Sequence, residues 1–192
     1  RPSVFILLVG LLAAVIGGWP PAAYGQAADG FPRTVMVEGE PVVIPAKPVR
    51  IAAVSGDVAD ILLEMVDPSR VVVVPIYMDN PAIYRNVEKA EAVPHRIASA
   101  VDLDPEAVLA YDPDLIIITL RQTAEIDALN LLRLSGIPIV AVSDWTGFDA
   151  LKANVMLIGQ AVGEDEAAAR IVQDIDERLA EVQRRLEGVT PK

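Results

Sequence analysis

Hydrophobic positions in the middle of the chain follow two alternating patterns that predict a parallel α/β sheet. Short apolar runs without a helical period are typical of strands buried on both faces, and they occupy residues 49–54, 71–74, 115–118 and 137–142. Residues 95–98 are a weaker strand candidate. Amphipathic segments between these strand candidates predict helices over residues 57–65, 81–87, 104–110 and 124–134. This alternation predicts right-handed crossovers and an α/β lobe over residues 49–146.

An extension over residues 26–48 precedes this lobe, and its pattern predicts a β-hairpin. Residues 35–37 and 42–44 are apolar, and the sequence Glu38-Gly39-Glu40 separates them. Two short strand-like runs around a glycine-containing break are typical of antiparallel strands joined by a tight turn.

The pattern changes after the lobe, where residues 147–192 predict a helical connector. Thr146 and Asp149 have the spacing of a capping box, and the helix that follows is expected to end at Gly163. A second helix is predicted over residues 164–187, some 24 residues or about 36 Å. Its apolar face contains residues 171, 175, 179, 182 and 186. Because a small lobe does not need a helix this long, we expect it to act as a strut.

The beginning of the chain has the layout of a secretory signal peptide over residues 1–25. Residues 4–16 are almost continuously apolar, follow Arg1 and precede a Gly/Pro break, and the small-x-small site Ala23-Tyr24-Gly25 predicts cleavage after Gly25. The run is short for a membrane span, and an uncleaved anchor is the alternative. Because no methionine opens the chain, we expect it to be a fragment.

Composition narrows the possible functions. The 192 residues are 53% apolar, which is enough for one core, and 16 basic against 27 acidic residues give a net charge of −11 that disfavours nucleic acid. The sequence has no cysteine, which excludes disulfides, thiol nucleophiles, iron–sulfur clusters and a lipidated cysteine in these residues. The single histidine, His95, argues against a multi-histidine metal site.

Candidate ligand-binding residues follow the predicted strands, because ligands of open α/β sheets bind beyond the carboxyl ends of the strands. Tyr77 and Trp145 offer aromatic surfaces, and Arg96 and Arg121 offer guanidinium groups for carboxylates or a negatively charged complex. Each of them can instead be an ordinary surface residue. The candidates are Ser55, Gly56, Asp57, Tyr77, Met78, Asp79, His95, Arg96, Thr119, Leu120, Arg121, Gln122, Ser143, Asp144 and Trp145.

Catalysis has less support in the sequence. Ser55 and Asp57 are the residues that a hydrolase would place in the cleft, but no Gly-x-Ser-x-Gly, phosphate-loop or dinucleotide motif occurs. A haem-ligand role for His95 or Tyr77 is a further alternative to an ordinary loop or cleft side chain. No resident cofactor or metal is predicted, because the acidic residues around Asp104 lack the spacing of a calcium loop. A stand-alone interaction domain that self-associates through the long helix is the third interpretation.

The order of segments resembles the substrate-binding proteins of ABC importers for iron-siderophore and vitamin B12-type ligands. The matching segments are FPRTV (31–35), VIPAKP (43–48), RIAAVS (50–55), DPSRVVVV (67–74), EAVLAYDPDLII (106–117), SGIPIV (135–140) and LIGQAVG (157–163). The resemblance covers nearly all of residues 31–188. It implies a bilobed α/β protein whose lobes are joined by a long helix, of which this chain contains the N-terminal lobe and the helix, with the second lobe missing.

The same resemblance implies a function in ligand binding and delivery, without a catalysed reaction. Such a protein captures a ferric-siderophore or related chelate, such as cobalamin or haem, and delivers it to an ABC permease at the membrane. It is exported to the periplasm or the outer face of the cytoplasmic membrane, and it is a monomer when intact. Glu106 matches the position at which the family docks onto basic permease residues, although a carboxylate there can also serve only the helix dipole.

Overall fold

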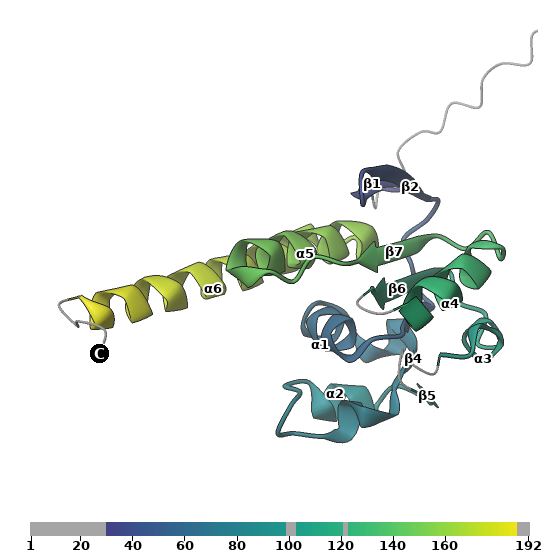
Figure 1. Cartoon of the computed structure of the whole chain (residues 1–192), viewed down its shortest axis with the longest axis horizontal. Coiled ribbons are helices and arrows are strands. Elements are labelled where there is room, and N and C mark those ends of the chain that lie inside the picture. Colours follow the sequence, from purple (N-terminus) through teal and green to yellow (C-terminus); the bar gives the residue numbers. More distant parts are fainter. Residues whose placement is uncertain (1–29, 99–102, 121–122, 188–192) are drawn as a thin grey trace, which may run out of the picture.

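Within residues 30–98, 103–120 and 123–187, which the computed structural model describes, a five-stranded parallel sheet forms the centre of an α/β lobe (Figure 1). The strands pair in the order β5-β4-β3-β6-β7, and every pairing is parallel. They are β3 (Ile51–Ala53), β4 (Val71–Pro75), β5 (His95–Ile97), β6 (Leu115–Thr119) and β7 (Ile139–Val142). The predicted fold class is confirmed.

Burial explains why these segments form the sheet. Every residue of β3, β4, β6 and β7 is buried, so the continuous apolar runs correspond to strands covered on both faces. From β3 to β4 the chain moves toward one edge of the sheet, and from β6 to β7 it moves toward the opposite edge. Right-handed crossovers therefore place α1 (Gly56–Met65) and α4 (Thr123–Arg133) on opposite faces.

The helix predicted over residues 81–87 is wrong. A 3-10 turn, η2 (Ile76–Asp79), follows β4 instead, and α2 comprises Val87–Glu91. The carboxylate of Asp60 in α1 accepts hydrogen bonds from the backbone N–H groups of the two residues before α2. These N–H groups point to α1, and the segment stays irregular until α2 begins.

The predicted N-terminal hairpin is confirmed. It consists of β1 (Arg33–Val37) and β2 (Glu40–Ile44), which pair antiparallel around a two-residue turn. The turn residues Glu38 and Gly39 have φ angles of 52° and 84°, and positive values at both positions are typical of a type I′ turn. The inward-facing side chains of the hairpin, including Val35 and Ile44, are buried in the core.

Two helices follow the sheet as an antiparallel pair (Figure 1). Helix α5 (Gly147–Val162) ends at Gly163, whose φ of 74° is left-handed, as the sequence predicted. Helix α6 (Asp165–Leu186) then runs back along α5 and extends past it, so the predicted long helix is confirmed. The capping box predicted at the beginning of α5 is wrong, because the Thr146 hydroxyl donates to Asp144 and makes no cap bond.

The remaining helix starts agree better with their local sequence. Helix α3 (Pro105–Leu109) begins as predicted, since the carboxylate of Asp104 accepts a hydrogen bond from the backbone N–H of Glu106. A short 3-10 turn, η1 (Pro68–Arg70), leads into β4 and is capped in the same way by Asp67.

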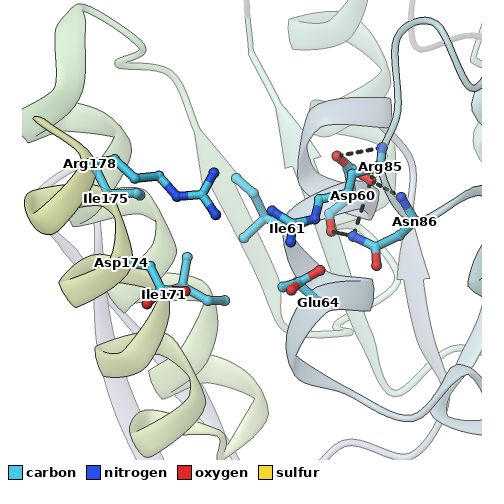
Figure 2. Close-up of a pocket in the computed structure, with 9 residues that line it drawn as sticks. All are labelled: Asp60, Ile61, Glu64, Arg85, Asn86, Ile171, Asp174, Ile175 and Arg178. Carbon is cyan, nitrogen blue, oxygen red and sulfur yellow. Dashed lines mark hydrogen bonds between the residues drawn. The ribbon is translucent and has the colours of Figure 1, made fainter. Parts of the chain in front are cut away.

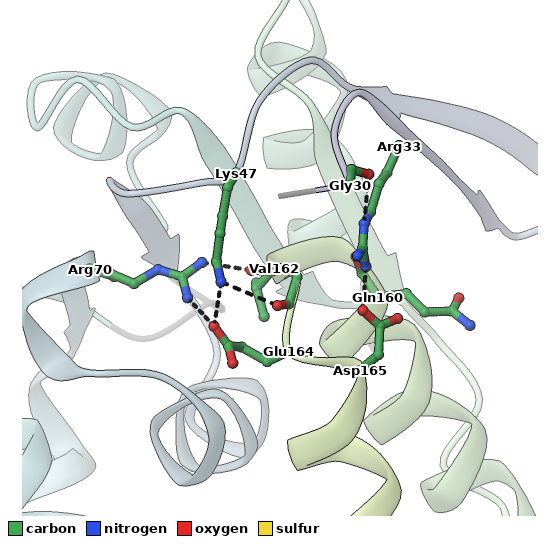
Figure 3. A network of polar contacts seen from close by, with 9 residues as sticks. Gly30, Arg33, Lys47, Arg70, Gln160, Val162, Glu164 and Asp165 are labelled. Carbon is green, nitrogen blue, oxygen red and sulfur yellow. Dashed lines mark hydrogen bonds and ion pairs between the residues drawn. The ribbon is translucent and has the colours of Figure 1, made fainter. Parts of the chain in front are cut away.

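A network of ion pairs fixes the corner between α5 and α6 (Figure 3). Glu164 accepts a hydrogen bond from Arg70 at 2.6 Å and forms an ion pair with Lys47 at 2.9 Å. Both cations also donate to backbone carbonyls at the end of α5. Beside them, Arg33 of the hairpin pairs with Asp165. The beginning of α6 is thereby tied to both the hairpin and the sheet.

The predicted signal peptide, residues 1–25, lies outside the described residues. Among the residues that are described, no helix has both the length and the apolar composition needed to cross a membrane.

Candidate functional site

The two central strands are joined by hydrogen bonds at the carboxyl edge of the sheet, where a ligand is expected. The Ser55 hydroxyl accepts a hydrogen bond from the backbone N–H of Thr119 at 2.9 Å. The Thr119 hydroxyl in turn donates to Asp57 at 2.7 Å. Ser55 and Thr119 are buried and Asp57 is half-buried. Ser55 therefore braces the sheet edge, and Asp57 carries the carboxylate of this group toward the surface.

Two tyrosines stack beside the first residue of α1. The ring centroids of Tyr77 and Tyr84 are 5.9 Å apart with an interplanar angle of 30°. A Cβ atom on Gly56 would lie 2.4 Å from the Tyr84 hydroxyl and 2.7 Å from a Tyr77 ring carbon. Only glycine leaves room for both rings here. The candidates Gly56 and Tyr77 are thus brought together, and they form an aromatic surface with Tyr84.

Three other candidates lie elsewhere than the sequence predicted. Met78 is fully buried in the core, so it faces away from any ligand at the edge. His95 and Arg96 do not follow a strand, because they belong to β5 itself. The exposed ring of His95 stacks on Tyr111 with centroids 4.3 Å apart.

The guanidinium group of Arg96 serves the turn before β5. It donates to the backbone carbonyls of Ala90 and Val93 at 2.7 and 2.8 Å. Its contact with Asp79, at 3.4 Å, is longer. The guanidinium group of Arg96 therefore donates mainly to backbone carbonyls, which weakens the prediction that it binds a ligand anion. Arg121 and Gln122 lie outside the described residues.

Trp145 is held in an ordered loop after β7. Its side chain is half-buried and packs against the core. The preceding residue, Asp144, accepts hydrogen bonds from the hydroxyl and backbone N–H of Thr146, which hold the pKa of Asp144 below its ordinary value. The carboxylate therefore stays ionised and hydrogen-bonded at neutral pH. Asn154 of α5 donates to the Asp144 carbonyl at 2.7 Å.

A groove of about 190 Å³ lies between α1, the segment before α2, and α6 (Figure 2). Its apolar lining comes from Ile61, Ile171 and Ile175. Figure 2 shows the side chains of Arg85 and Arg178 extending into the groove from its two sides. Within the described part of the chain, neither guanidinium group has an ion-pair partner. The groove therefore offers two guanidinium groups beside an apolar wall, and the carboxylates of Asp60, Glu64 and Asp174 line it as well.

The sequence reasoning missed Tyr84, Arg85 and Arg178. The first two fell inside the helix predicted over residues 81–87, which does not form. Arg178 lies on the predicted long helix but was not among the residues of its apolar face. Its spacing of three and seven residues from Ile175 and Ile171 was the available signal, because such spacings place side chains on neighbouring parts of one helix face. Among the described residues, no group of three or more His, Cys, Asp or Glu side chains is placed to hold a metal ion.

Comparisons with known proteins agree with the fold. The chain is 23% identical over 166 residues to the uncharacterized ABC transporter substrate-binding lipoprotein YvrC of Bacillus subtilis (strain 168), a match that covers 86% of this chain and 51% of YvrC. The structure is similar to that of the siderophore-binding protein BauB bound to a complex of two acinetobactin molecules and ferric iron, with a TM-score of 0.66 and 22% identity over 84% of this chain and 56% of BauB.

The molybdate-bound periplasmic binding protein MolA of Haemophilus influenzae is also similar, with a TM-score of 0.70 and 18% identity over 82% of this chain and 55% of MolA. The chain thus spans about half the length of these relatives. The model of the periplasmic binding protein family matches residues 51–192. Because this match covers most of the chain, the chain belongs to the periplasmic binding protein family.

Proposed function

We propose that this chain forms the N-terminal lobe and connecting helix of the substrate-binding component of an ABC importer, and that the ligand is a ferric-siderophore or a related chelate such as cobalamin or haem. The observation that carries the proposal is the aromatic surface of Tyr77 and Tyr84 on Gly56 at the carboxyl edge of the sheet. The family consists of binding proteins rather than enzymes. The proposal for the ligand is supported by the similar fold of BauB, whose structure contains a ferric acinetobactin complex.

Arg85 and Arg178 sharpen the proposed specificity. They replace Arg96, whose guanidinium group binds the backbone, as candidates for recognising negative charge on the ligand. Arg85, which lines the groove, follows Tyr84 of the aromatic surface directly in the sequence. Aromatic faces together with guanidinium groups suit an aromatic chelate with a net negative charge.

Titration of the chain with the ferric acinetobactin complex, cyanocobalamin and haemin tests this proposal. A two-lobed protein with nanomolar affinity has a binding free energy of about −12 kcal/mol. One lobe that supplies half of this free energy should therefore bind with a Kd of tens of micromolar. We expect Arg85→Gln and Arg178→Gln each to weaken binding of the anionic ferric complex about tenfold. Isothermal titration calorimetry gives both values.

Arg170→Gln is the matched control for this titration, because Arg170 lies on the same helix but outside the groove and is 70% exposed. Its affinity should equal that of the unmodified chain. Equal affinities for all three variants would contradict the role of the groove. Absence of saturable binding of every chelate up to about 1 mM, far above the expected Kd, would contradict the proposed function itself.

Glu106 is the proposed contact with the permease. It is exposed on α3, while its neighbour Asp104 is occupied in capping the helix. With the protein reconstituted with its permease, Glu106→Lys should reduce ligand uptake several-fold without changing ligand affinity, because it places a cation against basic permease residues. Glu88→Lys on α2 is the control of equal charge change. Unaltered uptake by the Glu106 variant would argue against docking at this position.

Export to the periplasm or to the outer face of the cytoplasmic membrane is part of the same proposal. It is supported by the description of the relative YvrC as a substrate-binding lipoprotein of an ABC transporter. Fractionation of cells that produce the protein tests it, and recovery in the cytoplasm alone would contradict it.

A stand-alone interaction domain is the second candidate function. The observation that favours it is the exposure of Val182 and Leu186 on the part of α6 beyond α5, at 51% and 57%. A concentration-dependent dimer in sedimentation experiments that Leu186→Ser abolishes would favour this interpretation, whereas a monomer at all concentrations would count against it.

A further inference from the structure

The N-terminal hairpin contacts the loop that carries Trp145. The hydroxyl of Ser143, the first residue after β7, donates a hydrogen bond of 2.5 Å to the carboxylate of Glu38 in the hairpin turn. Strand β1 also packs against α5 and β7, so the whole hairpin lies beside this loop. The hairpin precedes residues 51–192, which the family model matches, and nothing in that match assigns it a role.

Glu38 occupies a backbone conformation that its residue type disfavours. Its φ of 52° is in the left-handed region, where a type I′ turn strongly prefers Asn or Gly. The side chain of Asn can stabilise such a turn locally, whereas that of Glu is too long to do so. A strained residue of this kind persists where another contact compensates for it. In this chain that contact is the hydrogen bond to Ser143, 105 residues away in the sequence.

The position of Ser143 gives this hydrogen bond a consequence for the site. On the other side of Trp145, the loop is held by Thr146, whose hydroxyl donates to Asp144. Asn154 holds the Asp144 carbonyl from α5. Before these anchors, at the end of β7, the side-chain bond from the hairpin adds to the backbone hydrogen bond between Leu120 and Val142. Trp145 thus lies in a segment anchored from two separate elements.

We propose that Glu38 is a positioning residue that holds the Trp145 loop at the ligand-binding edge, which makes the hairpin part of the binding site. The inference rests on the proposed function for its ligand. The effect on Trp145 itself can be measured without any ligand.

The sequence contains two tryptophans, Trp19 and Trp145, so Trp19→Phe leaves Trp145 as the single indole fluorophore. In this background, we expect Glu38→Gly to shift the Trp145 emission to longer wavelength and to raise its acrylamide quenching constant about twofold, because the loop opens more readily. The melting temperature should stay the same or rise, since glycine relieves the strain of the turn. A residue with a merely structural role would lower the melting temperature instead.

Three further variants complete the test. Ser143→Ala should reproduce the fluorescence change, and adding Glu38→Gly to it should change nothing more, because both remove one contact. Glu38→Gln keeps an acceptor oxygen and should restore the original emission. Glu40→Ala, an exposed neighbour in the same hairpin, should have no effect.

Unchanged emission and quenching in both the Glu38→Gly and the Ser143→Ala variants would overturn the proposal. So would a loosened Trp145 with undiminished affinity for the ferric acinetobactin complex, for which we expect a severalfold loss. If the parent chain binds no chelate while the fluorescence differences persist, the proposed function fails and the positioning of Trp145 by Glu38 stands.

Discussion

Replacing Gly159 with alanine is expected to lower the free energy of unfolding by about 3 kcal/mol, the upper part of the range for overpacked cores. A Cβ atom at this position would lie 2.4 Å from the Cβ of Ala168 and 3.2 Å from the backbone oxygen of Glu164. Both atoms are rigidly attached to the backbone, so no side-chain rotation relieves the clash. Helices α5 and α6 must move apart, and urea denaturation should show the loss.

A double-mutant cycle makes this prediction specific. Ala168→Gly alone should cost about 1 kcal/mol, the usual penalty for glycine inside a helix. In the double variant Gly159→Ala, Ala168→Gly, the methyl group changes helices and the packing volume is conserved. Most of the stability lost in Gly159→Ala should therefore return. A double variant less stable than Gly159→Ala would contradict a clash at this contact.

Glu164→Gln is expected to cost about 2 kcal/mol, as removal of one partner from a partly buried group of charges does. Glu164 forms ion pairs with Arg70 and Lys47, and the side chain of Arg70 is only 15% exposed. Glutamine keeps one acceptor oxygen but leaves two neighbouring cations without a counter-charge. Thermal or urea unfolding measures the effect, which should shrink at high salt as the remaining cations are screened.

Glu166→Gln provides the control on the same helix turn. The side chain of Glu166 is 96% exposed, and its contact with Arg170 is 3.9 Å long. Its replacement should cost less than about 0.5 kcal/mol. Equal losses for the two variants would show that the corner network adds no more than an ordinary surface pair.

The strands were predictable because burial on both faces leaves an unmistakable pattern. The runs Val71–Val74 and Leu115–Ile118 contain only β-branched or aliphatic residues, and the structure buries all of them. The helix ends at Asp104 and Gly163 were predictable because capping depends on neighbours within a few residues. At these two positions local chemistry determined the outcome, and the sequence was sufficient.

The two errors have different causes. The segment before α2 is irregular because Asp60, some 25 residues earlier, binds its backbone, and nothing near the segment in the sequence indicates this partner. The error at Thr146 is local, because Asp144, only two residues earlier, accepts its hydrogen bonds in a turn that competes with the capping box.

The candidate site was predictable only in its location. The rule that ligands meet the carboxyl edge of the sheet predicted Gly56 and Tyr77 as candidates, and the structure brings these two residues together. Which side chains point outward depends on the turn that follows each strand. The 3-10 turn after β4 directs Met78 into the core, and the groove combines Arg85 with Arg178 from elements far apart in the chain.

The attachment of α6 has a mechanical consequence. Ion pairs hold its first turn, and Lys152 of α5 pairs with Asp176 near its middle. The ten residues from Asp176 to Leu186 span about 15 Å, so a rotation of about 5° at Asp176 would swing the far end of the helix through about 1 Å. The packing of α6 on α5 therefore sets how accurately the end of α6 is aimed.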